Sequence, residues 1–424
     1  MARVYIEAYG CSANLADSEM VQGLLVRAGH TIIGEPGGAD ASVVLSCTVK
    51  TPTQRKIEKR IRQLHLSGRP LIVAGCMPKA QRDLVVEIAP GASLMGPDNI
   101  REVVGVVEAA IEGVSSEALE GGSPDRTCLP RARENPVIHI APIASGCLGS
   151  CTYCIVKRAR GELTSFPADA IIDDARSALE SGCREIWVTA EDTAAYRWGD
   201  VGLPGLLEGL SGLPGRFFIR VGMMTPNQAM PILDSLIEAY SSDRVFKFVH
   251  IPVQAGSDEV LKRMGRRYTV DDYRALAWRF RDELPLVSIS TDIICGFPGE
   301  TEDQFDDSLR LVEETKPNVL NISRFWSRPG TVAASMEGQL HGRVTKERSR
   351  RLTELWKEMS MESNLRWVGW EGEAVIDEVG RSGGMVARNI AYKPVVINEP
   401  VRVGDFVNVR ITGARRGYLI GETA

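Results

Sequence analysis

Short apolar runs alternate with helix-like segments along most of the chain. In the first 112 residues the apolar runs are Val4–Ala8, Ser42–Ser46 and Leu71–Ala74, and helical periodicity follows each one. This alternation is typical of βαβ units, in which helices connect parallel strands. It predicts a doubly wound parallel sheet for residues 1–112. The polar residues 113–135, which contain several Gly and Pro, are expected to form a linker.

A second alternation, in residues 136–345, predicts six strands with helices between them. The expected strands are Val137–Ile143, Glu185–Thr189, Phe217–Val221, Val245–Ile251, Val287–Ile294 and Val319–Phe325. The expected helices are Ala168–Glu180, Asn227–Tyr240, Ser257–Arg263, Val270–Glu283 and Thr301–Glu314, the last with a capping box formed by Thr301 and Gln304. Six βα units predict an open (βα)6 barrel, and right-handed crossovers put the carboxyl ends of its strands on one rim.

The last part of the chain has a different pattern. A charged helix is expected from Lys346 to Leu365, within a connecting segment of residues 346–366. Residues 367–424 contain short alternating strands broken by glycine: Glu373–Asp377, Met385–Arg388, Val395–Ile397, Phe406–Ile411 and Tyr418–Gly421. They predict a small all-β barrel. The predicted fold class is therefore α/β, with a small β-barrel added at the C-terminal end.

Composition excludes several classes of protein. The 424 residues are 44% hydrophobic, yet no apolar run reaches the ~20 residues of a membrane helix, and no secretory signal is recognisable. The net charge of −5 excludes a globally basic nucleic-acid binder, so RNA contacts would have to be local. Nine cysteines make a poor disulfide framework but good thiolate ligands in a reducing compartment, which predicts a cytoplasmic protein.

Three cysteines form the strongest chemical motif of the chain. Cys147, Cys151 and Cys154 follow the first predicted strand of the barrel with spacings of 4 and 3 residues. Three thiolates can bind three irons of a [4Fe–4S] cubane and leave the fourth iron open to a chelating cosubstrate. A zinc knuckle or incidental cysteines are the alternatives, although no fourth Cys or His lies nearby in the sequence.

Three more cysteines each follow a predicted strand of the first domain. Cys11, Cys47 and Cys76 should converge in space, because the carboxyl ends of parallel strands share one edge of the sheet. Small thiols also suit strand ends for packing alone, and the pattern does not decide between a second cluster and that reading. The remaining cysteines, Cys128, Cys183 and Cys295, are expected to be structural or incidental.

These motifs resemble those of the radical S-adenosylmethionine (SAM) superfamily, and specifically of its methylthiotransferase family. The resemblance covers nearly the whole chain, including a C-terminal RNA-binding barrel called TRAM. It also rests on five motifs outside the cysteines: Ala159–Gly161, Glu191–Asp192, His250–Ser257, Asp292–Thr301 and Arg328–Thr331. The phrase Ser-Cys-Thr-Val-Lys at residues 46–50 is most similar to the archaeal and eukaryotic branch, which acts on tRNA N6-threonylcarbamoyladenosine next to the anticodon. The cysteine loop lacks the family's common asparagines, and Ala255 stands where serine is frequent.

The resemblance implies an enzyme with two [4Fe–4S] clusters and SAM as cofactors. Reductive cleavage of SAM at the cluster on Cys147, Cys151 and Cys154 would give a radical that removes the C2 hydrogen of the adenine. A cluster on Cys11, Cys47 and Cys76 would carry the methylthio group. The implied partners are tRNA, an external electron donor and a sulfur donor. A monomer without membrane contact is expected.

Further residues are candidates by resemblance or by charge. The SAM-binding candidates lie near strand ends, where packing or ion pairing is the alternative role: Tyr153, Glu191, Asp192, Arg220, Gln254 and Gly296. The RNA-binding candidates lie in two basic blocks, where a solvated charged face is the alternative: Lys50, Arg55, Lys59, Arg62, Arg415 and Arg416. Lys50 is also a candidate for binding the threonylcarbamoyl carboxylate. Exposed aromatics for base stacking are expected at Tyr392, Phe406 or Tyr418.

Two other kinds of function stay open at this point. The same reaction could act on isopentenyladenosine in tRNA or on an aspartate of a ribosomal protein. The basic C-terminal block favours RNA over the protein substrate. A non-catalytic iron–sulfur protein that binds RNA or senses redox state would leave the motifs of the barrel rim unexplained.

Overall fold

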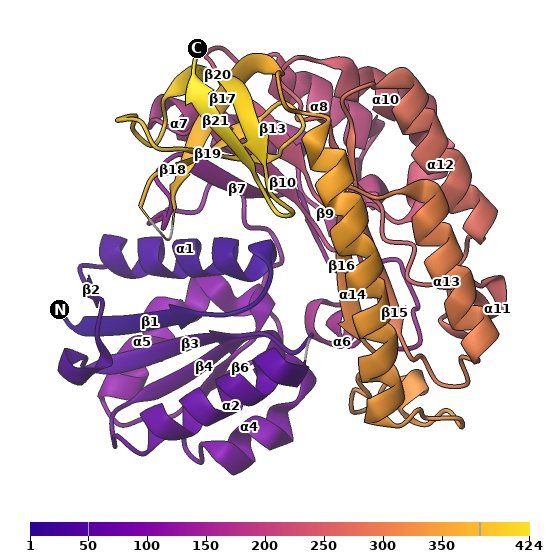
Figure 1. Ribbon diagram of the computed structural model, residues 1–424. Helices are drawn as coiled ribbons and strands as arrows, with labels where there is room; N and C mark the ends of the chain where they lie inside the picture. The colour runs from indigo at the N-terminus through magenta and orange to yellow at the C-terminus, as the bar shows by residue number, and fades with distance from the viewer. Residues whose placement is uncertain (50, 381–382) are drawn as a thin grey trace.

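The N-terminal part of the chain forms a six-stranded parallel sheet (Figure 1). The computed structural model describes residues 1–49, 51–380 and 383–424. In spatial order the strands are β2 (Thr31–Ile33), β1 (Arg3–Ala8), β3 (Ala41–Ser46), β4 (Leu71–Gly75), β5 (Ser93–Met95) and β6 (Glu117–Ala118). The three predicted strands are confirmed within one residue at each end. The short strands β2, β5 and β6 lie outside the predicted set because so few residues carry no readable alternation.

Helices cover both faces of this sheet, as a doubly wound fold requires. They are α1 (Ser12–Arg27), α2 (Thr51–His65), α3 (Cys76–Ala80), α4 (Arg82–Ile88) and α5 (Val103–Ile111), with 3₁₀ turns η1 (Pro36–Gly38) and η2 (Pro97–Glu102). Val43 and Leu45 of β3 pack with α1 and α5, whereas Val44 between them packs with α2 and α4. Alternate side chains of one strand thus enter two separate cores, which confirms the predicted fold of this part.

Residues 113–135, the expected linker, are packed against the first domain. Glu117–Ala118 form the edge strand β6, which pairs with β5. Further along, Leu129 is buried and the Arg126 side chain is only 2% exposed, with its Nε 2.7 Å from Oδ1 of Asp17. Polarity and glycine content predict a spacer, but a buried ion pair fixes this segment to α1.

Six parallel strands form the central barrel. They are β7 (Ile138–Pro142), β10 (Glu185–Thr189), β13 (Phe218–Val221), β14 (Phe248–His250), β15 (Ser288–Cys295) and β16 (Val319–Arg324). They make two three-stranded sheets, β7-β10-β13 and β14-β15-β16, which are joined by a single bridge between Ile219 and Val245. In the part of the chain that the structure describes, β7 and β16 remain unpaired edges, so the barrel is open as predicted. The loops contain two short antiparallel strand pairs: β8 (Ala144–Ser145) with β9 (Thr164–Ser165), and β11 (Arg197–Trp198) with β12 (Val201–Gly202).

The central barrel contains four of the five predicted helices as single elements. Its helices are α6 (Val156–Arg160), α7 (Ala168–Glu180), α8 (Leu203–Ser211), α9 (Pro226–Ala229), α10 (Leu233–Ser241), α11 (Asp258–Arg263), α12 (Val270–Glu283) and α13 (Glu302–Thr315), with 3₁₀ turns η3 (Thr193–Ala195), η4 (Met230–Ile232) and η5 (Val332–Ala334). Helices α6 and α8 lie outside the predicted set. The expected helix Asn227–Tyr240 is wrong as one element, because Pro231 lacks the amide hydrogen that an uninterrupted helix needs. The capping box of Thr301 and Gln304 is confirmed.

A long helix and a closed β-barrel complete the chain. Helix α14 (Gly342–Leu365) runs along the central barrel and starts before Lys346, because Nδ1 of His341 accepts a hydrogen bond from the N–H of Arg343. The C-terminal barrel closes in the order β17 (Glu371–Val379), β18 (Met385–Asn389), β19 (Pro394–Ile397), β21 (Leu419–Thr423) and β20 (Phe406–Ala414). The predicted all-β barrel is thereby confirmed.

Aromatic side chains join the C-terminal barrel to the central barrel. The ring of Tyr392 lies 4.9 Å from that of Phe246, and Phe406 lies 5.9 Å from Phe218. The expectation that Tyr392 and Phe406 are exposed stacking platforms is therefore wrong, because both rings pack against the neighbouring domain. Tyr418 is 39% exposed and stays available for stacking.

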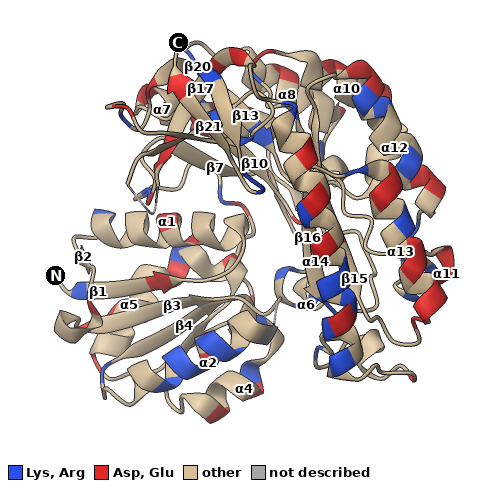
Figure 2. Ribbon diagram, viewed as in Figure 1, with Lys and Arg blue, Asp and Glu red and all other residues tan. Residues whose placement is uncertain are grey.

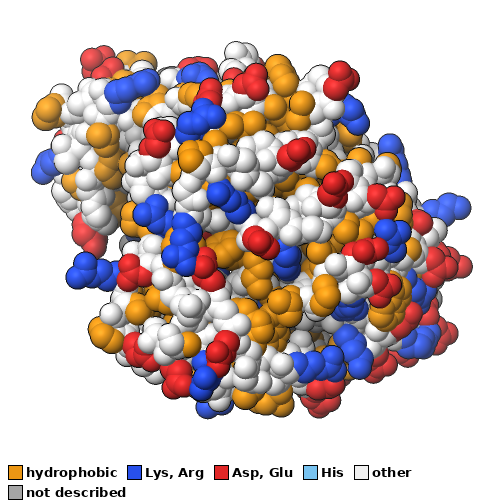
Figure 3. Space-filling view, turned by 90° about the horizontal axis from the view of Figure 1, so that it is seen from above, with side chains coloured by type: hydrophobic (Ala, Val, Ile, Leu, Met, Phe, Trp, Pro, Cys, Tyr) orange, Lys and Arg blue, Asp and Glu red, His pale blue; other side chains and the backbone are white. Residues whose placement is uncertain are grey.

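Charge is distributed unevenly over the elements (Figure 2). Helix α2 carries Lys and Arg on its outer side, whereas α13 is mostly acidic. Seen from above, Lys and Arg side chains are interspersed with Asp and Glu (Figure 3). Across the described residues, no helix is both long enough and apolar enough to span a bilayer.

Candidate active site

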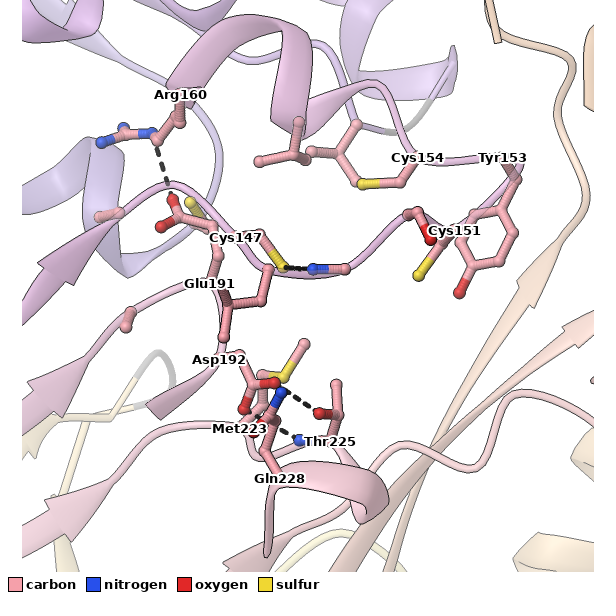
Figure 4. Close-up of a pocket in the computed structure, with 18 of the residues that line it drawn as sticks. Cys147, Cys151, Tyr153, Cys154, Arg160, Glu191, Asp192, Met223, Thr225 and Gln228 are labelled. Atoms are coloured by element: carbon pink, nitrogen blue, oxygen red, sulfur yellow. Dashed lines mark hydrogen bonds and ion pairs between the residues drawn. The ribbon is translucent and has the colours of Figure 1, made fainter. Parts of the chain in front are cut away.

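A cavity of about 320 Å³ lies between the carboxyl ends of the N-terminal sheet and the rim of the central barrel. All six cysteines of the two predicted triplets line it: Cys11, Cys47, Cys76, Cys147, Cys151 and Cys154. Cys11, Cys47 and Cys76 form the N-terminal triplet, and Cys147, Cys151 and Cys154 form the loop triplet. The two triplets are distant in sequence, and the fold brings them to one cavity. Figure 4 shows the loop triplet along one side of this cavity, Glu191 beside Cys147, and Asp192 with Thr225 on the opposite side.

The N-terminal triplet is positioned by strand ends. Cys11 follows β1 and Cys47 follows β3, so these two flank the point where the strand order of the sheet reverses. Ligands of doubly wound sheets bind in the crevice at that point. Gly10 adopts φ +117°, and a Cβ added there would lie 2.7 Å from Cβ of Cys47. Glycine therefore allows the chain before Cys11 to approach Cys47 closely.

The loop triplet is held by local contacts and by one neighbouring helix. The N–H of Gly149 donates to Sγ of Cys147 at 3.2 Å, and the N–H of Cys154 donates to the carbonyl of Cys151 at 3.0 Å. Thr152 anchors the loop, since its Oγ1 donates to the carbonyl of Arg263 at 2.9 Å. The loop then enters α6, which packs on α3, with Cys76 and Ala80 against Ile155 and Ala159.

The donor set fits two iron–sulfur clusters better than zinc. Among the described residues that line the cavity there is no seventh cysteine and no histidine, so each triplet lacks a fourth protein ligand. No three described Cys, His, Asp or Glu side chains are close enough to hold a single metal ion, as a zinc knuckle would require. In a cubane each cysteine binds a different iron, which needs wider spacing. Burial raises the pKa of Cys76 to about 12 and that of Cys147 to about 11. Binding of iron would therefore displace a proton from each of these thiols.

A buried arginine connects the two triplets. Arg160, at the end of α6, is only 4% exposed, and its Nη2 donates to Oδ1 of Asn14 at 2.8 Å and to Oδ2 of Asp17 at 2.7 Å. Its Nε lies 3.4 Å from Oε1 of Glu191, and Oδ1 of Asn14 also lies 3.7 Å from Sγ of Cys76. Burial alone would raise the pKa of Asp17, but the guanidiniums of Arg160 and Arg126 outweigh it and keep the pKa low.

Four SAM-binding candidates line the cavity: Tyr153, Glu191, Asp192 and Gln254. Oδ1 of Asp192 accepts the N–H of Thr225 at 3.1 Å, and burial raises the pKa of Asp192 to about 6 (Figure 4). Oε2 of Glu191 is buried and has no hydrogen-bond partner in the described part of the chain. Polar atoms of this kind suit the hydrogen-bond donors of a polar cosubstrate.

Gln254 and Tyr153 are held by their surroundings. Gln254 adopts φ +75°, which is rare for a residue with a side chain. Its N–H donates to the carbonyl of Asp292 at 2.8 Å, and its carbonyl accepts from Ile294 at 2.9 Å, so the strained backbone is fixed in register with β15. Nη2 of Arg266 donates to the hydroxyl of Tyr153, whose ring packs edge-on against Phe297.

Two SAM-binding candidates lie elsewhere. The guanidinium of Arg220 lies 5.1 Å from the rings of both Trp187 and Tyr392, within the aromatic contact to the C-terminal barrel. Gly296 faces α14, because a Cβ at this position would lie 2.3 Å from Cγ2 of Thr345. The structure thus gives Arg220 a packing role between domains and gives Gly296 a role in the close approach of a helix.

The RNA-binding candidates that the structure describes all lie on the surface. Arg55, Lys59 and Arg62 project from α2, while Ile57, Ile61 and Leu64 of the same helix are buried, as the sequence predicts. Lys50 lies outside the described residues. Arg415 and Arg416 are exposed in the turn between β20 and β21, and their carbonyls accept hydrogen bonds from Asn364 on α14.

Sequence reasoning did not single out several residues that the structure places at the site. Asn14, Thr225 and Arg266 line the cavity or contact its lining, and Asp17 pairs with Arg160. One signal was available for Asp17, since it lies one helical turn after Asn14 in an otherwise small and apolar stretch. Thr225 and Arg266 carry no such signal, because their roles depend on contacts to other segments.

Comparison with protein families covers all three parts of the chain. The Radical SAM superfamily model matches residues 142–312, and the TRAM domain model matches residues 366–424. The model described as uncharacterized protein family UPF0004 matches residues 3–96. A structure of the radical S-adenosylmethionine methyltransferase TsrM from Kitasatospora setae has a TM-score of 0.59 at 14% identity, covering 79% of this chain and 77% of that one. At this identity the likeness shows the fold alone.

Curated relatives match the chain over its full length. A probable threonylcarbamoyladenosine tRNA methylthiotransferase of Pyrococcus horikoshii is 41% identical, covering 100% of this chain and 99% of that protein. One of Methanothermobacter thermautotrophicus is 42% identical, with 99% of each chain covered. The human threonylcarbamoyladenosine tRNA methylthiotransferase is 36% identical, covering 99% of this chain and 74% of its own length. The chain therefore belongs to the radical SAM methylthiotransferase family, in the group of the threonylcarbamoyladenosine tRNA methylthiotransferases.

Proposed function

We propose that this protein replaces the C2 hydrogen of N6-threonylcarbamoyladenosine in tRNA by a methylthio group, with SAM and two [4Fe–4S] clusters as cofactors. One observation carries the proposal: both cysteine triplets line the same cavity. A reaction that removes hydrogen at one centre and delivers sulfur from another needs both centres within reach of one base. The position next to the anticodon and the cytoplasm as the place of the reaction belong to the same proposal.

In this proposal the chain's own residues bind and orient the reactants. Cys147, Cys151 and Cys154 would hold one cluster, and Cys11, Cys47 and Cys76 the other. When bound, the clusters would supply the reductive cleavage of SAM and the methylthio group. Glu191, Asp192 and Gln254 would accept or donate hydrogen bonds to SAM, and Tyr153 would close one wall of its site. Arg160, whose Nε lies 3.4 Å from Oε1 of Glu191, would hold that carboxylate in place.

Relatives and surface charge support the choice of substrate. The curated relatives that cover nearly the whole chain are named for threonylcarbamoyladenosine in tRNA. The exposed cations of α2 lie on the helix that follows Cys47 in the chain, where they would bind phosphates beside the cavity. Since the target atom of a stacked base is inaccessible, the base would be extruded into the gap between the two triplets. An external electron donor and a sulfur donor complete the reaction, and the protein would act as a monomer.

Nucleoside mass spectrometry after an anaerobic reaction tests the proposal. The reconstituted protein, SAM, a sulfide source and a chemical reductant are mixed with two tRNAs, one threonylcarbamoylated and one isopentenylated. We expect a methylthio-for-hydrogen gain on the threonylcarbamoyl nucleoside alone. A gain only on the isopentenyl nucleoside would contradict the substrate, and 5′-deoxyadenosine without any RNA product would direct the search to a ribosomal protein. Clusters without any SAM cleavage would indicate a non-catalytic protein.

A further inference from the structure

A second cavity, of about 420 Å³, adjoins the one that holds the six cysteines. The two cavities share Val49, Tyr153, Cys154, Val156 and Gln254 in their linings, so they are contiguous. Its volume lies within the ~300–1,000 Å³ that is typical of small-molecule sites. The candidates for SAM binding after β10 line only the first cavity, so the second is free to take another group.

The second cavity contains a buried arginine with unused hydrogen-bond donors. Arg328 is 4% exposed, and its Nη1 donates to Oε1 of Gln54 at 2.6 Å. Its Nε and Nη2 are buried and have no partner among the described residues. A buried guanidinium with two unpaired donor nitrogens is costly unless an anionic ligand compensates it.

A tight turn fixes Arg328 in this position. The N–H of Thr331 donates to the carbonyl of Arg328 at 3.1 Å, and Gly330 adopts φ +73° after Pro329. Proline followed by a glycine with positive φ fits a type II turn. Nη1 of Arg158, from α6, donates to the carbonyl of Pro329 at 3.1 Å. The motif Arg328–Thr331 thus presents one cation to the cavity on a rigid support.

A second cation lines the same cavity. Arg324, at the end of β16, also lines it, and its guanidinium lies 5.1 Å from the ring of Trp326. No carboxylate of the described residues forms an ion pair with Arg324 or Arg328. The carboxylate that lines the cavity, Asp292, accepts from Nδ2 of Asn321 at 2.7 Å and lies 3.0 Å from Nε2 of His250. An anionic group of a ligand would therefore bind near the two arginines and away from Asp292.

We infer that the second cavity binds the N6-threonylcarbamoyl group and that Arg328 and Arg324 pair with its carboxylate. The inference rests on the proposed function and assigns the specificity for its substrate. A planar guanidinium binds a carboxylate through two parallel hydrogen bonds. An isopentenyl group has no charge, so it would leave Nε and Nη2 of Arg328 without an acceptor. Sites with buried polar groups reject ligands that cannot satisfy them.

The test compares two substrates and two arginine variants. One tRNA carries the natural threonylcarbamoyl group and the other carries it as the neutral methylamide. We expect Arg328→Met and Arg324→Met each to lower kcat/KM on the natural tRNA roughly thirtyfold or more, with little change on the methylamide. Formation of 5′-deoxyadenosine and iron per protein should match the wild type. Arg176→Met, an exposed arginine on α7, is the control and should change neither rate.

Other results would overturn the inference. Equal losses on both substrates would show that the arginines do not read the carboxylate. A fall in iron content in Arg328→Met would assign this residue to the adjacent cluster at Cys47 instead. Equilibrium dialysis with the labelled nucleoside separates the inference from the proposed function. If the wild type modifies neither tRNA but binds the nucleoside through Arg328, the proposed reaction is refuted and the binding site is supported. If binding depends on neither arginine, the proposed binding site is refuted.

Discussion

The N-terminal triplet and the loop triplet reach one cavity by different means. Cys11, Cys47 and Cys76 stand at the ends of three strands, so their convergence depends on the whole N-terminal sheet. Cys147, Cys151 and Cys154 stand in one loop, whose shape depends on short hydrogen bonds within it and on the anchor at Thr152. The first arrangement is a property of the tertiary fold, whereas the second is encoded locally. Changes in backbone packing should therefore affect the two triplets unequally.

The largest expected effects separate the two triplets by their chemistry. We expect the triple variant Cys147→Ser, Cys151→Ser and Cys154→Ser to form no detectable 5′-deoxyadenosine, because it would lack the cluster that we propose to bind SAM. The variant Cys11→Ser, Cys47→Ser and Cys76→Ser should still cleave SAM but form no methylthio product. Chromatography of 5′-deoxyadenosine and nucleoside mass spectrometry measure both results.

Iron analysis and a control cysteine complete this comparison. Each triple variant should keep about half of the bound iron, because one of the two proposed [4Fe–4S] clusters would remain. Cys128→Ser changes an exposed cysteine outside the cavity and should behave like the wild type. Methylthio product from the second triple variant would refute the assignment of two clusters.

A smaller but still large effect is expected at the residue that connects the triplets. Arg160→Met leaves the buried carboxylate of Asp17 with one of its two arginines, and such losses cost about 3–5 kcal/mol. We expect a lower midpoint of urea unfolding. Arg176→Met, which breaks an exposed pair with Asp173, should cost about 0.5 kcal/mol or less. Equal midpoints for both variants would mean that Arg160 does not hold the two domains together.

Backbone packing provides the next test, because it should affect only one triplet. Gly10→Ala forces a Cβ to within 2.7 Å of Cβ of Cys47 at φ +117°, and should cost roughly 1–3 kcal/mol. The iron of the N-terminal cluster should fall, while SAM cleavage persists. Gly29→Ala has a similar φ of +90° with nothing within 4 Å, so it tests backbone strain without the clash. Loss of SAM cleavage in Gly10→Ala would show that the two triplets are not independent.

The smallest expected effect concerns the outer surface of α2, the helix that follows Cys47 of the N-terminal triplet. Changing Arg55, Lys59 and Arg62 to Gln removes three exposed cations of α2. We expect tRNA affinity to fall about tenfold at moderate salt, and the slope of log affinity against log salt to become shallower by about 2 to 3. Filter binding across a salt series measures both. Changing Lys262, Arg310 and Lys357 to Gln instead is the control with the same charge loss, and equal slopes in the two variants would exclude α2 as a phosphate-binding surface.

Sequence patterns predicted what depends on single segments. Strand positions, the doubly wound sheet, the open barrel and the cysteine spacings all follow from periodicity and from the fact that parallel strands end at one edge. The patterns could not identify the contacts that a side chain makes with residues of another domain. Arg220 stands near a strand end as a SAM-binding residue would, but a β-strand alternates its side chains, and here the outer face is covered by Tyr392.

Arg328 shows that sequence patterns also miss contacts between distant segments at the candidate site. It stands in a recognisable motif, yet its burial depends on Gln54, which is 274 residues away in the chain. Gly296 likewise suggests space for a ligand, whereas Thr345 of α14 occupies that space. Periodicity within one segment carries no information about such contacts, because they arise only when separate domains pack.

The C-terminal barrel covers the seam between the two half-sheets of the central barrel. The two half-sheets meet at one bridge between Ile219 and Val245, and the rings of Phe218, Phe246 and Phe248 line this seam on its outer side together with Val375. The N–H of Lys247 donates to the carbonyl of Ile390 at 2.7 Å, so the C-terminal barrel supplies a hydrogen bond where the sheet lacks one. This domain therefore stabilises the junction of the central barrel, and its removal would expose the aromatic rings along that junction.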